Sequence, residues 1–533
     1  MKRRNFLASS SALATSMAAP AVFSPLKAQS RQETLLIVSE NTPNMIDIHG
    51  VGANRPSYEV SWNTHDRLMT YGVKKDASGQ DHYDYSKLEP ELATDWNVTP
   101  TSATFKLRKE AKFHDGTPIT AKDVKWSFDR AVTVGGFPTF QMAAGSLQKP
   151  EQFVAVDDHT FRVDFLRADK LTMPDLAVPV PVVMHSELAK KHATATDPWA
   201  MEWCKNNLAG GGAYKIDRWQ PGQEVVYSRN EDWKNGPMPK IKRVILRIIP
   251  SAGNRRALLE RGDADISFDL GSKDFAELKS SPKLTIVGTP VENALQYIGL
   301  NVKQKPFDNV KVRQAIAYAI PYQKIQDAVM YGQAIPLFGG ANNKFKGISW
   351  PQKHGYNTDI AKAKALMVEA GYPEGFETTL SFDLGLAGIN EPLAILVQES
   401  LAQIGIKAPI NKIPGANWRA ELLKKNMPMI TNTFGGWLNY AEYFFFWCYH
   451  GQNAVFNTMS YQNPAMDALI DKARFTTGPE YESAVKGFVD MAFEEVPRIP
   501  LFQPMLNVAM QKNVTGYRYW FHRQLDYRQL VKG

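Results

Sequence analysis

The chain has 533 residues, 44% of them hydrophobic and 22% charged, which is typical of ordinary globular cores and predicts two to four domains. Its formal net charge of +8 is a weak excess for this length, and no basic run indicates nucleic-acid binding. Low-complexity tracts, internal repeats and apolar runs of transmembrane length are absent from the sequence.

Residues 1–28 have the pattern of an export signal peptide. A basic start and an Ala- and Ser-rich apolar run end at Ala28, the small residue before the predicted cleavage site. The twin arginine in Arg3-Arg4-Asn5-Phe6-Leu7 predicts the twin-arginine route, which carries folded cargo. An ordinary secretory signal is the alternative. Removal of the signal leaves 58 basic and 54 acidic residues, a net charge of +4.

Only two cysteines occur, Cys204 and Cys448. Their separation excludes a short-range metal or redox pair, and two buried unpaired thiols are the expectation. A disulfide in an oxidising compartment is the alternative. Neither cysteine follows the signal, so we expect a periplasmic protein without a lipid anchor.

The first half of the mature chain is predicted to be rich in strands. Alternating or continuously apolar runs, typical of half-buried and buried strands, occur at 34–38, 104–107, 160–165, 224–227 and 244–249. One helix is predicted to begin after Thr120, with Thr120 as its cap and Asp123 at its third position.

The second half alternates helices with strands, which predicts an α/β lobe. Asp308 is the expected cap of a helix that ends at Pro321, and glycines 371 and 405 are expected immediately beyond the ends of two others. The predicted helices are 309–320, 359–370, 391–404, 464–474 and 478–496; the predicted strands are 378–382, 407–413 and 429–433.

Five blocks in the mature chain carry a family resemblance. They cover residues 92–124, 210–233, 257–266, 306–315 and 403–407. In this order they resemble the family 5 extracellular solute-binding proteins of ABC transporters, the type that takes up peptides, nickel and opines. The resemblance extends over essentially the whole mature chain.

The resemblance implies an α/β fold of the two-lobed periplasmic-binding-protein type, with an extra strand-rich subdomain (cluster C type). The ligand would be enclosed between lobes that close about a hinge. The expected division is 1–28 export signal; 31–60, 210–295 and 500–533 core of lobe one; 61–209 extra subdomain; 296–499 lobe two.

The densest cluster of candidate ligand contacts is at 434–449, where nine of sixteen residues are aromatic. Exposing such a segment to water would be costly, so it is expected to be buried or to line a cavity. In the family this region lines the cleft. The predicted contacts here are Trp437, Asn439, Tyr440, Glu442 and Tyr443, whereas the phenylalanines at 444–446 are expected in the core.

The same segment departs from the peptide-binding pattern of the family. Peptide-binding relatives have an aspartate shortly after Gly-Trp that pairs with the free amine of the peptide. Here the residues after Trp437 are Leu438-Asn439-Tyr440-Ala441, and Glu442 is the alternative partner. Because an unpaired buried ammonium is expensive, the recognition of a free amine stays open.

The other predicted contacts lie outside this segment. Lobe one is expected to contribute the loop 41–54 and, from the segment 62–65, Asn63 and His65. Arg419 is a candidate for bidentate binding of a ligand carboxylate. The alternatives are a surface loop for the first group and a solvated helix face for Arg419.

Catalytic and metal motifs are not found. The sequence has no His-Glu-x-x-His, Gly-x-Ser-x-Gly, P-loop or Gly-x-Gly-x-x-Gly pattern, so no enzyme activity and no cofactor are predicted. His49, His65 and His450 are the three histidines that could converge on nickel, although hydrogen-bonded histidines are the ordinary alternative.

We therefore predict a monomeric periplasmic receptor that captures a peptide or peptide-like solute and delivers it to an inner-membrane ABC permease. The alternatives are a non-peptide solute (an opine, chelated nickel or a saccharide), or a ligand-presenting subunit of a sensor.

Overall fold

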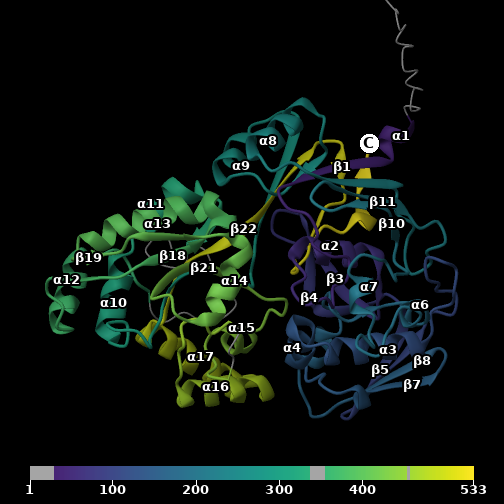
Figure 1. Ribbon diagram of the computed structural model, residues 1–533, viewed down its shortest axis with the longest axis horizontal. Coiled ribbons are helices and arrows are strands. Elements are labelled where there is room, and N and C mark those ends of the chain that lie inside the picture. The colour runs from purple at the N-terminus through teal and green to yellow at the C-terminus, as the bar shows by residue number, and fades with distance from the viewer. Residues whose placement is uncertain (1–28, 337–354, 453–455) are drawn as a thin grey trace, which may run out of the picture.

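The computed structural model describes residues 29–336, 355–452 and 456–533. The predicted export signal lies outside these ranges. Two bodies lie side by side and share one long strand, β22 (Arg498–Gln511), which runs from one body into the other (Figure 1). Body one contains the strands before β15 together with the C-terminal residues after β22. Body two contains the elements from β15 to α17.

A twelve-stranded mixed sheet extends through both bodies. Ten of its strands have the order β10-β11-β12-β1-β13-β22-β15-β21-β18-β20, and the other two, β14 and β16, each pair with β22. In body one the strands and helices around this sheet are β1 (Thr34–Ser39), β10 (Tyr214–Gln220), β11 (Glu224–Arg229), β12 (Arg243–Ile248), β13 (Ile266–Ser267), β14 (Leu284–Pro290), α1 (Gln29–Gln32), α2 (Arg55–Thr64), α8 (Ala252–Arg261) and α9 (Ser272–Leu278). The predicted strands at 34–38, 224–227 and 244–249 are confirmed.

The chain passes between the bodies twice, once between β14 and β15 and once within β22, and the two crossings lie next to each other. The C-terminal half of β22 pairs with β14, from Gln511 to Met505, and its N-terminal half pairs with β15 (Ala294–Leu300). Between β14 and β15, Val291 N–H donates to the carbonyl of Pro504 over 2.9 Å, and its own carbonyl accepts from Gln503 over 3.0 Å. Both crossings are therefore tied together by short hydrogen bonds.

Body one also carries smaller sheets and helices. A four-stranded antiparallel sheet, β5-β6-β8-β7, packs against α3, and a three-stranded sheet has the order β24-β4-β3. The elements are β2 (Asp66–Arg67), β3 (Met69–Lys75), β4 (Asp81–Pro90), β5 (Ala93–Val98), β6 (Ser102–Leu107), β7 (Phe153–Asp157), β8 (Thr160–Asp164), β9 (Val182–Val183), β23 (Val514–Thr515), β24 (Arg518–Tyr519), β25 (Val531–Lys532), α3 (Ala121–Thr133), α4 (Gly136–Ala144), α5 (Thr172–Asp175), α6 (Ser186–Lys190), α7 (Met201–Cys204), η1 (Pro150–Gln152) and η4 (Tyr527–Gln529).

The predicted start of α3 is confirmed. Thr120 is its N-cap in extended conformation, and the Asp123 carboxylate accepts from the backbone N–H of Thr120 over 3.0 Å. The other oxygen of Asp123 accepts from Ser186. One local capping pattern thus also anchors α6 against α3.

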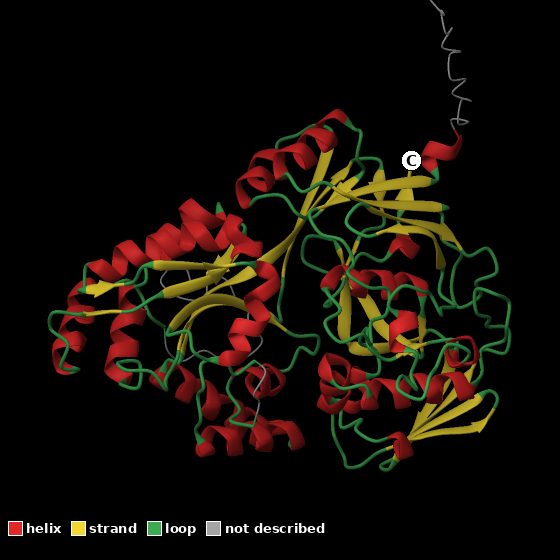
Figure 2. Cartoon of the chain, viewed as in Figure 1, coloured by secondary structure: helices red, strands yellow, loops and turns green. Residues whose placement is uncertain are grey.

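In body two, helices surround the sheet strands (Figure 2). The elements are β15, β16 (Ala334–Pro336), β17 (Phe376–Glu377), β18 (Leu380–Asp383), β19 (Ile406–Lys407), β20 (Ile410–Ile413), β21 (Met429–Gly435), α10 (Val310–Ala319), α11 (Tyr322–Ile325), α12 (Ile360–Glu369), α13 (Ala387–Ala402), α14 (Gly415–Lys424), α15 (Ala441–Cys448), α16 (Pro464–Phe475), α17 (Gly478–Glu495), η2 (Gln326–Met330) and η3 (Leu384–Leu386).

Three boundaries in body two differ from the sequence prediction. Asn309, not Asp308, caps α10, because its side chain accepts from the N–H of Lys311. Helix α13 begins at Ala387 and ends at Ala402, so Gly405 lies further beyond the helix end than predicted. The strand predicted over 407–413 is divided into β19 and β20 around Pro409, which has no N–H for a ladder bond.

Both cysteines are free and buried, as expected for small apolar side chains. Burial raises the pKa of each thiol to about 12, so neither is a reactive thiolate at neutral pH.

Candidate functional site

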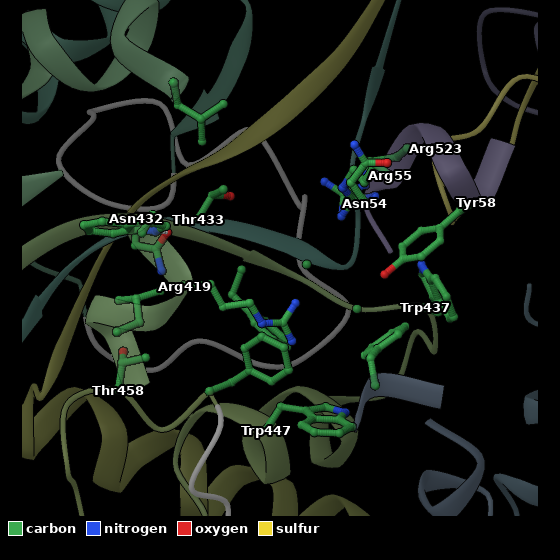
Figure 3. Close-up of a pocket in the computed structure, with 18 of the residues that line it drawn as sticks. Asn54, Arg55, Tyr58, Arg419, Asn432, Thr433, Trp437, Trp447, Thr458 and Arg523 are labelled. Carbon is green, nitrogen blue, oxygen red and sulfur yellow. Dashed lines mark hydrogen bonds between the residues drawn. The ribbon is translucent and has the colours of Figure 1, made fainter. Parts of the chain in front are cut away.

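A cavity of about 480 Å³ is lined by residues from both bodies. This volume is within the range of small-molecule sites. Body one contributes the first turn of α2, α4 and the segment after β24, and body two contributes β15, β21, α14 and α15 (Figure 3). The lining residues are Ala53, Asn54, Arg55, Tyr58, Phe137, Tyr297, Leu386, Trp418, Arg419, Leu422, Asn432, Thr433, Phe434, Gly435, Gly436, Trp437, Tyr443, Trp447, Phe456, Thr458 and Arg523.

Nine of the 21 residues that line the cavity are aromatic. Trp437, which follows β21, packs edge-on against Tyr58 of α2 with ring centroids 5.3 Å apart, and against Phe137 of α4 at 5.0 Å. Trp437 belongs to body two, whereas both partners belong to body one. It therefore closes one side of the cavity by contacts that exist only while the two bodies are together.

A small polar group lies on the body-two side. The Asn432 side chain of β21 donates to the Tyr297 hydroxyl over 3.2 Å and accepts from the Trp418 indole over 3.4 Å. These bonds fix the orientation of the Asn432 amide at the cavity wall. Fixed polar groups between aromatic walls are the usual means by which a binding site orients its ligand.

Three arginines supply the charge of the cavity. Figure 3 shows Arg55 and Arg523 next to one another on one side, with Arg419 extending from the opposite side. The Arg55 guanidinium donates to the His522 carbonyl over 3.3 Å, and Arg419 lies over the Phe456 ring at 5.5 Å. Among the cavity-lining residues that the structure describes, none is acidic.

Arg523 is held in an unusual environment. Its backbone is in the left-handed region (φ 61°), which is uncommon for a residue with a side chain. Its Nε and Nη2 atoms are shielded from solvent and have no hydrogen-bond partner within the described parts of the chain. Burial, followed by the nearby charge of Arg55, lowers the pKa of Arg523 to about 9.

The neighbouring backbone makes room for this guanidinium. Gly435, near the end of β21, has no side chain, and a Cβ atom there would lie 2.5 Å from Nη2 of Arg523. Any larger residue would force the guanidinium to move. The glycine therefore allows Arg523 of body one to lie against the backbone of body two.

Three predicted contacts line the cavity: Trp437, Tyr443 and Arg419. The Tyr443 hydroxyl donates to Gln141 of α4 over 2.8 Å, which adds a second contact between the bodies. Arg419 is exposed on α14 and faces the cavity rather than an outer surface. Their contact with ligand stays a prediction.

Asn439, Tyr440 and Glu442 lie outside the cavity lining. Asn439 donates to Glu292 over 2.9 Å. Glu442 is only 1% exposed, pairs with Lys170 at 2.7 Å and accepts from Tyr481 at 3.0 Å. Because its carboxylate is turned toward Lys170 and Tyr481, Glu442 does not face the cavity.

Asn63 and His65 are also placed away from the cavity. The Asn63 side chain donates to the Leu525 carbonyl and accepts from the Tyr527 N–H, so it joins α2 to the C-terminal segment. His65 is buried beside Thr64, and its pKa is lowered to about 3, chiefly by burial. Both side chains have structural partners in body one.

The three histidines considered for nickel, His49, His65 and His450, lie beside hydrogen-bonding or ion-pair partners in the structure. The described ranges contain no group of three or more His, Cys, Asp or Glu residues arranged to hold a metal ion. His49 contacts the Val180 carbonyl at 2.8 Å, and His450 lies 3.5 Å from Asp471.

Within the residues that the structure describes, none of the helices has the length and apolar character needed to cross a membrane.

Several lining residues were not singled out from the sequence. The loop 41–54 was expected to approach the ligand, and its last residues, Ala53 and Asn54, do line the cavity. Asn54 caps α2 and thereby aims Arg55 and Tyr58 at the same space. The Asn54-Arg55-Pro56 start of a helix was a readable signal for α2, whereas nothing in the local sequence indicates Arg523.

Two ion pairs connect the bodies, and each body supplies the base of one pair and the acid of the other. Lys170 of body one pairs with Glu442 at 2.7 Å, and Arg474 of body two pairs with the adjacent Asp169 at 3.0 Å. Lys170 also donates to the Ala473 carbonyl and Arg474 to the Ala144 carbonyl. We call these four charged residues (Asp169, Lys170, Glu442 and Arg474) the clasp.

The clasp should hold the bodies together, because its charged groups are largely shielded from water and its two ion pairs form only across the interface. Arg474→Met is therefore expected to open the ligand-free protein and increase its radius of gyration in X-ray scattering. Affinity for ligand should fall by about tenfold, in the range measured for partly buried charge pairs. Lys190→Met, which breaks only an exposed pair with Glu187, is the matched control and should leave both quantities unchanged. An unchanged radius for Arg474→Met would contradict a role in closure.

Comparison with known proteins defines the class. The model of the bacterial extracellular solute-binding proteins, family 5, matches residues 87–456. The chain belongs to this family. It is thus a solute-binding protein of an ABC importer, a transport receptor and not an enzyme.

Individual relatives agree with this assignment. The chain is 28% identical over 499 residues to the probable D,D-dipeptide-binding periplasmic protein DdpA of Escherichia coli (strain K12), covering 91% of each chain. Among solved structures, DppA of Helicobacter pylori in complex with the peptide STSA superposes with a TM-score of 0.79 at 21% identity, covering 94% of this chain and 98% of DppA. AgaA of A. tumefaciens R10, in complex with agropinic acid, gives a TM-score of 0.77 at 26% identity, covering 94% and 99%. The predicted fold, two-lobed α/β of cluster C type, is confirmed.

Proposed function

We propose that the protein captures a peptide or peptide-like solute in the periplasm and delivers it to an inner-membrane ABC permease. The observation that carries the proposal is the cavity of about 480 Å³ whose walls come from both bodies. Its aromatic lining suits a solute of a few residues with several fixed polar contacts. The relatives support this class, since their names and titles specify a D,D-dipeptide, the peptide STSA and agropinic acid.

The proposed mechanism is closure about a hinge. The two adjacent crossings at 291–293 and 503–505 are the segments about which two rigid lobes would turn. We propose that the lobes follow the predicted division, with 296–499 as the moving unit opposite the rest. Ligand would favour the closed form by contacting both walls at once, and the closed form would dock on the permease.

The periplasmic location is supported by the predicted signal peptide and by the periplasmic relative DdpA. The twin-arginine route stays a prediction of the Arg3-Arg4 motif. Its test is export of a variant with Lys-Lys in place of Arg3-Arg4, which should remain in the cytoplasm.

The solute itself can be identified by mass spectrometry of protein purified from periplasm. Native spectra should show a mass above that of the mature chain, and denaturing spectra should release a solute small enough for the cavity. Peptide or peptide-like masses would support the proposal. A saccharide or a nickel chelate would replace the peptide-like class while keeping the receptor function.

A further inference from the structure

Among the described residues that line the cavity, all the charged side chains are positive. Its three ionisable arginines come from both bodies, and its remaining polar lining consists of amides, hydroxyls and backbone groups. Glu442, the alternative partner for a ligand amine, is occupied by Lys170 and Tyr481 outside the cavity. Glu292 is held by Asn439, also outside the lining. A ligand ammonium would therefore find no carboxylate among the described residues that line the cavity.

Two of the arginines are placed where they repel one another. Arg55 and Arg523 lie together on the body-one side (Figure 3), and among the described residues neither has a carboxylate partner. Arg523 keeps two shielded donor nitrogens, Nε and Nη2, without acceptors among the described residues. Leaving shielded guanidinium nitrogens without acceptors costs free energy, so an anion placed between the two side chains would stabilise this arrangement.

The third arginine faces them across the cavity. Arg419 projects from α14, and the aromatic ring of Phe456 lies beneath its guanidinium. The rings of Tyr58, Trp437 and Trp447 line the same cavity and supply apolar wall. The cavity is thus built for a molecule with acid groups at two ends and an uncharged carbon skeleton between them.

We infer that the solute is an organic diacid without a required free amine, such as an opine or an amine-blocked acidic peptide. One carboxylate lies between Arg55 and Arg523, and the other lies on Arg419. This inference rests on the proposed receptor function and narrows its substrate class. The closure of the two bodies brings the opposing arginines onto one ligand, so the diacid itself provides the bridge between them.

The test uses the solute released from the native protein and two probe peptides. At neutral pH the released solute should bind to an anion-exchange resin, and methyl esterification should abolish that binding. Ligand-free protein should bind acetyl-Ala-Glu at least about 30-fold more tightly than the neutral acetyl-Ala-Gln-amide, as expected when a buried charge loses its partner. The amine of Ala-Glu should give no advantage over the acetylated form.

Variants of the arginines test whether these side chains bind the carboxylates. Arg523→Gln and Arg55→Gln should each weaken acetyl-Ala-Glu binding by at least about 30-fold, and Arg523→Gln should not lower the melting temperature of the ligand-free protein. The matched control is Arg243→Gln on β12, an exposed arginine outside the cavity, which should bind as the wild type does. The unchanged melting temperature distinguishes loss of an anion contact from general unfolding.

The outcomes separate the inference from the proposed function. A neutral or cationic solute, or tight binding that survives Arg523→Gln, would overturn the diacid inference and leave the receptor function intact. A protein that releases no solute and is stabilised by no acidic, neutral or basic peptide would contradict the proposed function as well.

Discussion

Replacing Asp47 by alanine is expected to destabilise the protein by about 3–5 kcal/mol, because it leaves the Arg130 guanidinium buried without its counter-charge. Asp47 and Arg130 form a two-point ion pair with contacts of 2.5 and 3.0 Å, and both side chains are 0% exposed. The pair attaches the loop before α2 to α3. Loss of this attachment should also loosen the cavity wall formed by Asn54 and Arg55.

The measurement is thermal unfolding of the variant, with an expected decrease in melting temperature of roughly 6–20 °C for a unit of 150–250 residues. Asp158→Ala is the matched control, since Asp158 pairs with Lys122 at side-chain exposures of 61% and 76% and should cost less than about 1 kcal/mol. The double variant Asp47→Ala with Arg130→Met should recover part of the loss, because no buried charge remains. A decrease no larger than that of Asp158→Ala would contradict the proposed role of the pair.

The same ion pair predicts a dependence on pH. Burial alone would raise the pKa of Asp47, but the charge and hydrogen bonds of Arg130, with a smaller effect of His49, lower it below its ordinary value. The folded state therefore favours the ionised carboxylate, and its contribution to stability is present above about pH 4. It should be lost as the pH falls further, through the folded pKa. The stability difference between wild type and Asp47→Ala should become smaller over that range.

The second large effect is expected for Trp437→Ala, which should weaken ligand binding by at least about 30-fold, as for a buried aromatic at the centre of an interface. Trp437 is 4% exposed, and its ring contacts Tyr58 and Phe137 of the opposite body. Its removal opens the cavity to water on that side. Because these contacts are made between the bodies, each body should remain folded.

The measurement is ligand-induced stabilisation with the solute released from wild-type protein. At a hundred times the wild-type Kd the stabilisation of about 2.7 kcal/mol should fall to about 0.9 kcal/mol. Trp219→Ala, a partly buried tryptophan on β10 outside the cavity lining, is the control and should keep the full effect. A full ligand shift in Trp437→Ala would remove this residue from the binding site.

The aromatic segment after β21 shows how far sequence reasoning reached at the candidate site. Its composition indicated a cavity wall, and Trp437, Tyr443 and Trp447 do line the cavity. The side-chain direction within α15 was not predicted. Tyr443 and Trp447 are four residues apart and lie on one helix face, whereas Glu442 is turned toward Lys170 and Tyr481.

The body-one side was harder to predict because its residues come from distant parts of the chain. Arg55 and the carbonyl of His522 are 467 positions apart and meet within 3.3 Å. Asn63 was a predicted contact from the segment 62–65, but its amide holds the C-terminal segment through Leu525 and Tyr527. Short-range pattern alone cannot tell these two uses of a polar residue apart.

The sequence by itself determined the family, the α/β class and most helix and strand positions, because caps, periodicity and glycine stops act over a few residues. It also indicated one aromatic wall of the cavity. Only the tertiary structure decided that Arg55, Arg419 and Arg523 face one space, and that Glu442 is paired with Lys170 outside it. The charge of a cavity is a sum over side chains that folding brings together, so it is decided by long-range packing and not by any local segment.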